Sequence, residues 1–319
     1  MHPSIQVGPF RWSVFTLFLV LGGAMALPGR PAGYANESTT SQPAPEGVFE
    51  DDTMPDPEAA PAERPAGPLK VGVIVSKFTA TGPNWGGAPY GYTHANIAKE
   101  LAVEGIELHA IVEPESEGDA DCSNAIAENF PADVPMINGH DTTALQELDV
   151  IVGQRIANMH GEMLTAIHQA VQEGTGLFIA QTFATVTPGY REEVCDLFAM
   201  DSAAYAFNAT TVACEVQATD PLLEGTEDAG VDWQAQPSGT AGILREGATL
   251  LISVSDPSAI PVRRNEDPTF QLPLLYFTHH GKGGIVVSNF KDLPDPLLNL
   301  TGDPFFVRCV KRAAALRTQ

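Results

Sequence analysis

Three segments of this 319-residue sequence place amide, hydroxyl, imidazole or aromatic side chains directly after an apolar run. Amides and hydroxyls can satisfy the hydroxyls of a sugar, while aromatic rings stack on its apolar faces. We therefore expect a site for a carbohydrate or another small polar ligand. Its candidate residues are Asn84, Trp85, Tyr90, Tyr92, His94, Gln154, Arg155, Gln181 and Thr182. The alternative is that the aromatic residues only cover the edge of a sheet.

The stretch "GLFIAQTFATVTPG", residues 176–189, is an apolar run that breaks into polar residues, as strand-to-helix turns with a nucleophile do. Gln181, Thr182 and Phe183 occupy the turn, which therefore has neither a cysteine nor a serine and no flanking glycines. The Thr182 hydroxyl would need an adjacent base, and the sequence offers none nearby. We expect no catalytic residue here and interpret the chain as a binding module.

An enzyme is the alternative function. His94 could act with a carboxylate such as Glu113 or Asp141 in general acid–base chemistry, if the groups met within hydrogen-bond reach. The reaction would be the hydrolysis or isomerisation of a sugar derivative.

Histidines beside acids or other histidines raise the question of a metal site. His140, Asp141 and His160 are such residues, but their side chains would have to meet across the fold. We expect neither a metal nor another cofactor. His279 and His280 precede "GKGG", which lacks the full phosphate-loop spacing and predicts a solvated hairpin tip.

Alternating strand and helix patterns must position these side chains. Strands are predicted over residues 70–76, 106–112, 148–153, 176–180 and 248–254. Helices are predicted over residues 93–105, 161–174 and 304–316, and a hairpin over residues 272–289. The order predicts an α/β fold with a doubly wound, mostly parallel sheet, in which the carboxyl ends of the strands gather the three polar segments.

Four stretches, in this order, resemble the class I glutamine amidotransferase-like superfamily, especially its ThuA-like branch. They are "YGYTHANIAKEL", "LDVIV", "IHQAVQEGTGLFI" and "GKGGIVVSNF". The resemblance covers most of residues 69–316 and implies a flavodoxin-like sheet with a C-terminal β-hairpin and helix. It also implies where catalytic members carry a cysteine, in a Gly-x-Cys-x-Gly turn, and a later histidine. This chain departs at both places, with Gln181–Phe183 at the turn and no histidine in "SNFKDL", so we expect amidotransferase chemistry to be absent.

The beginning of the chain is typical of an exported protein. Basic residues precede an apolar run of about 16 residues and then small residues, which predicts a signal peptide over residues 1–35. Residues 36–68 are rich in proline and acids and predict a disordered linker, so that the domain spans residues 69–319. We expect secretion or a periplasmic location without a membrane span after cleavage. The alternative is an uncleaved anchor, although a spanning helix needs about 20 residues.

The net charge restricts the classes of partner, and the cysteine content raises the question of disulfides. With 17 Lys and Arg against 40 Asp and Glu, the formal net charge of −23 opposes binding to nucleic acid. A small polar ligand or a cell-envelope protein is the expected partner. Export would permit disulfides, with Cys195–Cys214 as the first pairing and Cys122–Cys309 as the second, while four buried free thiols are the alternative.

Overall fold

The computed structural model describes residues 67–76, 94–154, 159–180, 191–200, 205–208, 210–226, 233–256 and 272–318, all within the unit Glu58–Gln319. The predicted signal peptide and nearly all of the predicted linker lie outside these residues. No helix in the described part of the chain has the length and apolar character needed to cross a membrane.

Six strands form a parallel half of the sheet, in the order β3-β2-β1-β4-β5-β11. They are β1 (Leu69–Val75), β2 (Ile106–Val112), β3 (Met136–Asn138), β4 (Val150–Gln154), β5 (Gly176–Ala180) and β11 (Gly283–Ser288). Without the three-residue β3, this is the 2-1-3-4-5 order of flavodoxin-like sheets. The predicted fold class is therefore confirmed.

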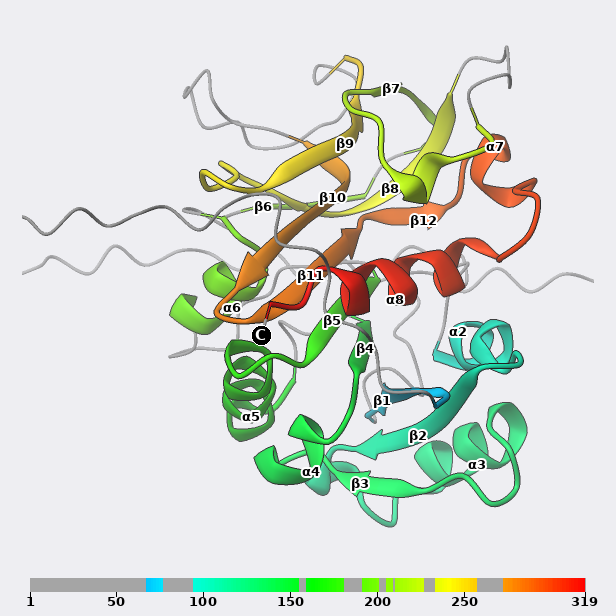
Figure 1. The fold of residues 1–319 in the computed structure, drawn as a ribbon, viewed down its shortest axis with the longest axis vertical. Helices are drawn as coiled ribbons and strands as arrows, with labels where there is room; N and C mark the ends of the chain where they lie inside the picture. Colours follow the sequence, from blue (N-terminus) through cyan, green and yellow to red (C-terminus); the bar gives the residue numbers. More distant parts are fainter. Residues whose placement is uncertain are drawn as a thin grey trace, which may run out of the picture. The chain divides into compact units, whose positions relative to one another are not determined.

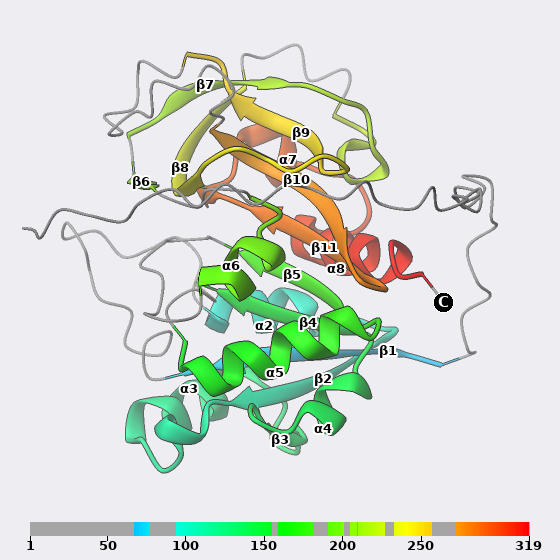
Figure 2. The same ribbon diagram turned by 90° about the vertical axis from the view of Figure 1, so that its left-hand side faces the viewer.

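Helices cover both faces of the parallel strands (Figure 1, Figure 2). One face packs against α2 (His94–Leu101), α3 (Ala120–Asn129) and α8 (Phe305–Ala315). The other packs against α4 (Thr142–Gln146), α5 (Gly161–Gln172) and α6 (Arg191–Leu197). In Figure 1, α5 lies to the left of the parallel strands and α2 to the right.

The apolar run of β1 supplies both of the resulting cores. Val71 and Val73 point into the core beneath α2 and α8, whereas Ile74 points into the core beneath α5. Gly72 faces the second core, where an added Cβ would lie 2.5 Å from Cδ1 of Leu148. A strand buried on both faces explains why this segment is continuously apolar rather than alternating.

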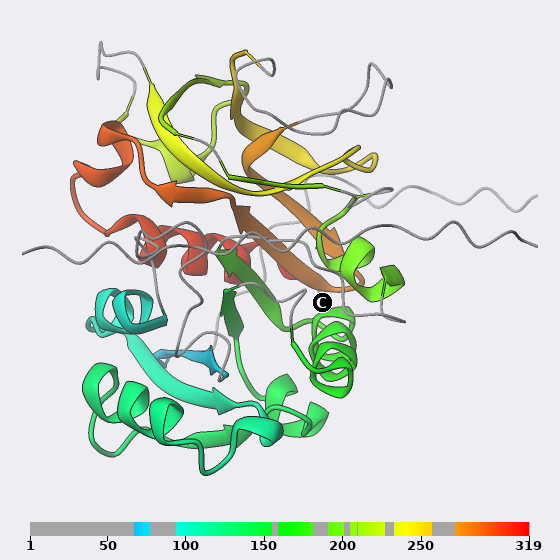
Figure 3. The ribbon, with the colours of Figure 1, turned by 180° about the vertical axis from the view of Figure 1, so that it is seen from behind.

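An antiparallel half extends the sheet beyond β11 (Figure 3). β10 (Pro273–His280) and β11 form the predicted hairpin, and β9 (Thr249–Val254) confirms another predicted strand. The sequence analysis missed the remaining strands of this half, which are β6 (Tyr205–Asn208), β7 (Val212–Val216), β8 (Gln234–Ala241) and β12 (Phe290–Asp292). The chain then forms the short α7 (Asp295–Leu298) before α8.

The four cysteines are buried and free, so the expected disulfides Cys195–Cys214 and Cys122–Cys309 are both wrong, and the alternative of four buried free thiols is confirmed. Cys195 belongs to the core beneath α5 and Cys214 to the other core, which separates the two thiols. Burial raises the pKa of Cys214 to about 11 and that of Cys309 well above its usual value. Thiols in such apolar surroundings are unreactive.

Candidate functional site

The order of the parallel strands reverses at β1. The chain continues from β1 to β2 and β3 on one side and returns to β4 and β5 on the other. In open α/β sheets, ligands bind at the carboxyl ends of strands beside such a switch point. Val75 of β1 is level with Val112 at the end of β2, and Gln154 of β4 is level with Ala180 at the end of β5. The carboxyl ends of these strands therefore lie along one edge of the sheet, called the carboxyl edge below.

Gln154 is the predicted ligand-binding residue whose side chain the structure describes. It ends β4 and is buried, with 6% of its surface exposed. His94 begins α2, but its side chain lies outside the described residues. The same is true of the other predicted residues, Asn84, Trp85, Tyr90, Tyr92, Arg155, Gln181 and Thr182.

The two carboxylates considered as partners of His94 have structural contacts. Asp141 is the N-cap of α4, where its Oδ1 accepts a hydrogen bond from the backbone N of Ala144 at 3.1 Å. Glu113 follows β2 and is 8% exposed, and its Oε1 accepts a hydrogen bond from the backbone N of His160 at 2.7 Å. Glu113 thereby ties the end of β2 to the start of α5.

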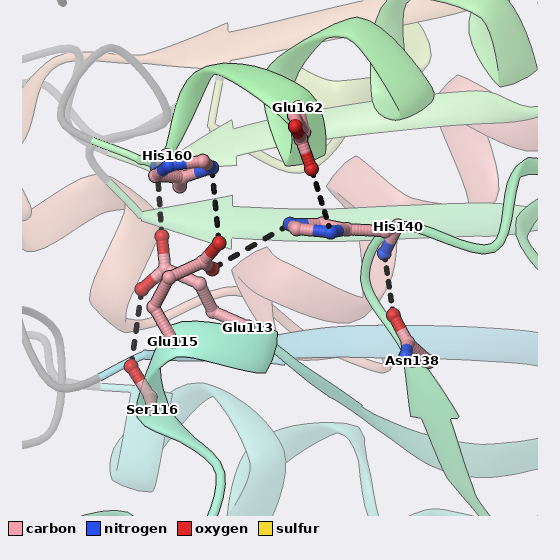
Figure 4. A network of polar contacts seen from close by, with 7 residues as sticks. All are labelled: Glu113, Glu115, Ser116, Asn138, His140, His160 and Glu162. Atoms are coloured by element: carbon pink, nitrogen blue, oxygen red, sulfur yellow. Dashed lines mark hydrogen bonds and ion pairs between the residues drawn. The ribbon is translucent and has the colours of Figure 1, made fainter.

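Glu115, His140 and His160 gather at the carboxyl edge and are called the Glu115 cluster below (Figure 4). Glu115 lies in the 3-10 turn η1 (Pro114–Ser116) after β2, His140 follows β3, and His160 directly precedes α5. Oε1 of Glu115 lies 3.1 Å from Nδ1 of His160, and its Oε2 lies 3.5 Å from Nε2 of His140. The two imidazole rings stack with centroids 5.7 Å apart.

A tight turn after β3 aims His140 at this cluster. Oδ1 of Asn138 accepts a hydrogen bond from the backbone N of His140 at 2.8 Å, and the backbone N of Gly139 donates to the carbonyl of Val112 at 2.8 Å. A Cβ added to Gly139 would lie 2.8 Å from Sδ of Met163 and 3.1 Å from the carbonyl of Val112, so a larger residue would require at least the end of the Met163 side chain to shift.

The two nitrogens of His140 have different surroundings. Nδ1 lies 3.3 Å from Oε2 of Glu162, whereas Nε2 is buried and makes no hydrogen bond to any described residue. The 3.5 Å approach of Nε2 to Oε2 of Glu115 is thus an ion-pair contact without hydrogen-bond geometry. A neutral imidazole with its proton on Nδ1 would keep its lone pair on Nε2.

Sequence reasoning found two of the three cluster residues. His140 and His160 do meet across the fold, which was the condition for a metal site, whereas Asp141 turns away to cap α4. Glu115 was missed, although its place just after the predicted strand 106–112 is the same signal that drew attention to Glu113.

A second histidine cluster consists of His168 of α5, Asp196 of α6 and His280 of β10, with Arg245 beside it. Nε2 of His168 lies 3.1 Å from Oδ2 of Asp196, Nη1 of Arg245 donates to Oδ1 of Asp196 at 2.6 Å, and the rings of His168 and His280 have centroids 4.3 Å apart. The β10–β11 turn lies level with the start of β5, because Ile285 pairs with Leu177. This cluster is therefore at the edge opposite to the carboxyl edge.

Burial and hydrogen bonding shift the acidity of this second cluster. Burial alone would raise the pKa of Asp196, but hydrogen bonds from Arg245 and His168 outweigh it and hold the pKa below its usual value. Burial, followed by the nearby His168, lowers the pKa of His280. The expected solvated hairpin tip is correct for the exposed His279 and wrong for His280, which packs against α5.

A small pocket of about 300 Å³ opens beside η1, between the ends of β2 and β3 and helix α3. Its volume is at the lower limit of ligand pockets, and both apolar and polar side chains line it. The lining residues are Val112, Pro114, Ser116, Glu117, Gly118, Cys122, Ser123, Ile126, Met136, Ile137 and Asn138.

Strand order and register define the chain as an α/β protein with a flavodoxin-like sheet extended by an antiparallel half. The chain matches no protein-family model and no curated protein.

Similar solved structures include two putative ThuA-like proteins and a beta-galactosidase. The ThuA-like protein from Bacteroides uniformis has a TM-score of 0.44 at 12% identity, over 80% of this chain and 95% of that one. The one from Parabacteroides merdae has a TM-score of 0.42 at 12% identity, over 79% and 92%. The beta-galactosidase from Rahnella sp. R3 has a TM-score of 0.45 at 14% identity over 78% of this chain, which spans 31% of the length of that enzyme.

Proposed function

We propose that this chain is an exported ThuA-like domain that binds a carbohydrate or a similarly polar ligand at the carboxyl edge, without amidotransferase chemistry. The observation that carries the proposal is the common level at which β1, β2, β4 and β5 end. The segments with the predicted ligand-binding residues follow these strands in the sequence, so we expect them to converge at that edge.

The side chains of these segments favour a neutral ligand with many hydroxyl groups. Trp85, Tyr90 and Tyr92 offer rings for stacking, and the amides of Asn84 and Gln154 can both donate and accept hydrogen bonds. Glu113 and Glu115 make the same edge acidic, which disfavours a phosphorylated or carboxylated ligand. A neutral sugar fits these properties better than an anionic metabolite.

Export and tethering complete the proposal. Residues 1–35 would direct the chain to a secreted or periplasmic location, and residues 36–68 would hold the domain away from the membrane or from an envelope partner. An uncleaved first segment would instead keep the domain at the membrane.

Acid–base catalysis on a sugar derivative is the second candidate function, favoured by the contacts of the Glu115 cluster. Imidazole and carboxylate groups 3.1–3.5 Å apart at a ligand-binding edge can donate and accept protons on the same substrate. The chemistry would be hydrolysis or isomerisation. Glu115, rather than Glu113 or Asp141, would supply the carboxylate, because those two groups are engaged in structural contacts.

The test is thermal unfolding of the purified chain with a panel of mono- and oligosaccharides. A bound ligand stabilises the folded state by mass action, by about 2.7 kcal/mol at a concentration of 100 times Kd. We expect a saccharide-dependent rise in the midpoint that Trp85→Ala abolishes. Gln169→Ala, on the exposed side of α5, is the control that should keep it.

Each outcome decides between the candidates. No shift with any saccharide would overturn the binding proposal. A shift without turnover supports the non-catalytic module, whereas turnover of the bound saccharide that is lost in Glu115→Gln would establish the second candidate instead.

A further inference from the structure

We propose that the Glu115 cluster is a binding site for a divalent transition-metal ion, with zinc as the best fit. The proposal does not rest on carbohydrate binding, because the metal can be measured without any saccharide. It rests on the donor atoms of Glu115, His140 and His160 and on the contacts that orient them.

In the described part of the chain there are two groups of three residues whose potential ligand atoms lie within 4.8 Å of one another. The charges around the two groups differ, and this difference shows which group is better suited to a cation. In the group of His168, Asp196 and His280, the guanidinium of Arg245 lies 2.6 Å from Asp196, so a cation would meet a fixed positive charge. In the described part of the chain, no lysine or arginine forms an ion pair with the Glu115 cluster. The charged neighbours there are the carboxylates of Glu113 and Glu162. A cation is therefore favoured at the Glu115 cluster.

The spacing of the donor atoms already suits a small ion. A tetrahedral ion with bonds of about 2.0–2.1 Å holds its ligand atoms about 3.3 Å apart. Oε1 of Glu115 lies 3.1 Å from His160 and its Oε2 lies 3.5 Å from His140, distances close to that value for two different oxygens of one carboxylate. One ligand atom from each of the three residues lies within 4.8 Å of the others, so the side chains must draw together to close around an ion.

The surroundings of His140 prepare one nitrogen as a ligand. Nδ1 of His140 lies 3.3 Å from Oε2 of Glu162, and its Nε2 approaches Oε2 of Glu115 at 3.5 Å. Nε2 is buried without a hydrogen bond to any described residue, so this nitrogen is not occupied by another contact of that kind. A carboxylate on the far nitrogen is the usual outer contact of a metal-binding histidine.

Hydrogen bonds to the Glu113 side chain hold the chain segments that carry the other two ligands. The buried Glu113 accepts hydrogen bonds from the backbone N of His160 at 2.7 Å and from Oγ of Ser116 at 3.1 Å. It thereby fixes both chain segments that carry the ligands Glu115 and His160. The ligands come from segments after β2, β3 and β4, which the sheet holds in register.

The donor set selects the kind of ion. Two imidazoles and one carboxylate suit zinc and related transition metals, whereas magnesium and calcium prefer oxygen ligands. Three protein ligands leave a coordination position for water or for an oxygen of a bound ligand. His160 and Glu115 have 47% and 41% of their side chains exposed, which leaves that position open to solvent.

The experiment is equilibrium dialysis of the chelator-treated full chain against zinc, followed by metal analysis, with cobalt(II) absorption as a report on coordination. We expect one ion per chain and a visible cobalt spectrum of low coordination number. Glu115→Gln and His160→Gln should lose the cobalt spectrum and should weaken zinc binding by more than Glu162→Gln does. Glu162→Gln, which alters an outer contact, should weaken it by about 10–100-fold.

Matched controls keep the result interpretable. His279→Gln and Glu117→Gln change exposed residues outside the cluster and should retain wild-type zinc binding. Because Glu115 and His160 are partly exposed, their variants should keep the wild-type circular dichroism spectrum. No stoichiometric zinc in the wild type would overturn the proposal. So would zinc binding that is lost in His168→Gln and kept in His160→Gln.

Discussion

Glu113 shows how one buried carboxylate can organise a site without being part of its chemistry. Both of its oxygens accept hydrogen bonds, one from the backbone of His160 and one from Ser116. A charge buried in this way is stable only while these donors face it.

We predict that Glu113→Gln lowers the free energy of unfolding by about 1–3 kcal/mol. The glutamine side chain has one oxygen, so its NH2 group must face one of the two hydrogen-bond donors and leave it unpaired. Chemical denaturation in the presence of a chelator measures the change without a contribution from metal. Glu117→Gln alters an exposed acid of the same segment and should stay within about 0.5 kcal/mol of the wild type. Equal losses in the two variants would contradict this role for Glu113.

His280 is the residue for which pH dependence can be predicted. Burial and His168 lower its pKa from the ordinary 6.5, while Asp196 acts in the opposite direction and Arg245 adds to the lowering. The folded protein therefore favours the neutral imidazole. As the pH falls below 6.5, the unfolded chain takes up a proton that folded His280 resists, so stability decreases until the folded pKa is passed.

We expect His280→Gln to flatten the decrease in unfolding free energy between pH 6.5 and about 5, above the range in which Asp196 contributes. Denaturant titrations at several pH values provide the measurement. His279→Gln, next to it in sequence but exposed, should retain the wild-type slope. An unchanged slope in His280→Gln would argue against the pKa shift.

At the scale of elements, the sequence was informative where a segment is long and buried on both faces. The runs that become β1, β4 and β5 were recognised because burial on both sides requires nearly continuous apolar residues, whereas in β2 Glu107 and His109 interrupt a run that is only partly buried. β3 has three residues, its ends exposed, and α4 has five, so neither carries enough periodicity to be read. The register between β2 and β3 that brings His140 to Glu115 is a long-range pairing with no local signature.

Asp141 illustrates how a residue type that is common in catalytic and metal sites can instead stabilise a secondary-structure element, here by capping α4. We predict that Asp141→Ala costs about 0.5–2 kcal/mol of stability through the lost N-cap of α4, while Asp141→Asn, which still caps, costs little. Thermal unfolding of the two variants distinguishes these effects. A large loss of zinc binding or of activity in Asp141→Asn would instead give the carboxylate a functional role.

At the scale of the whole molecule, the sheet separates two histidine clusters that the sequence could not tell apart. The Glu115 cluster lies at the carboxyl edge, with carboxylates around it. The second cluster, of His168, Asp196 and His280, lies at the opposite edge and is in contact with Arg245. Only the assembled sheet decides which histidines lie at the carboxyl edge. Composition contributes the acidic charge of −23, which attracts cations in general but selects no site.

The two cores also determine the state of the cysteines across the whole molecule. Cys195 lies in one core and Cys122, Cys214 and Cys309 in the other, and all four thiols are buried and free. We predict that a thiol reagent modifies the native protein slowly and titrates four thiols in denaturant without a reductant. The midpoint of thermal unfolding should be the same with and without reductant, because no cross-link restrains the unfolded chain.

Cys195→Ala makes this prediction sharper. With four independent thiols, the variant should lose one reactive group in denaturant. A disulfide to Cys214 would give two reactive thiols in the wild type before reduction and four after it, and in Cys195→Ala it would free its partner. Since these two sulfurs belong to different cores, forming that bond would require one core to open. We therefore expect Cys195 and Cys214 to remain separate reactive thiols even after exposure to an oxidising compartment.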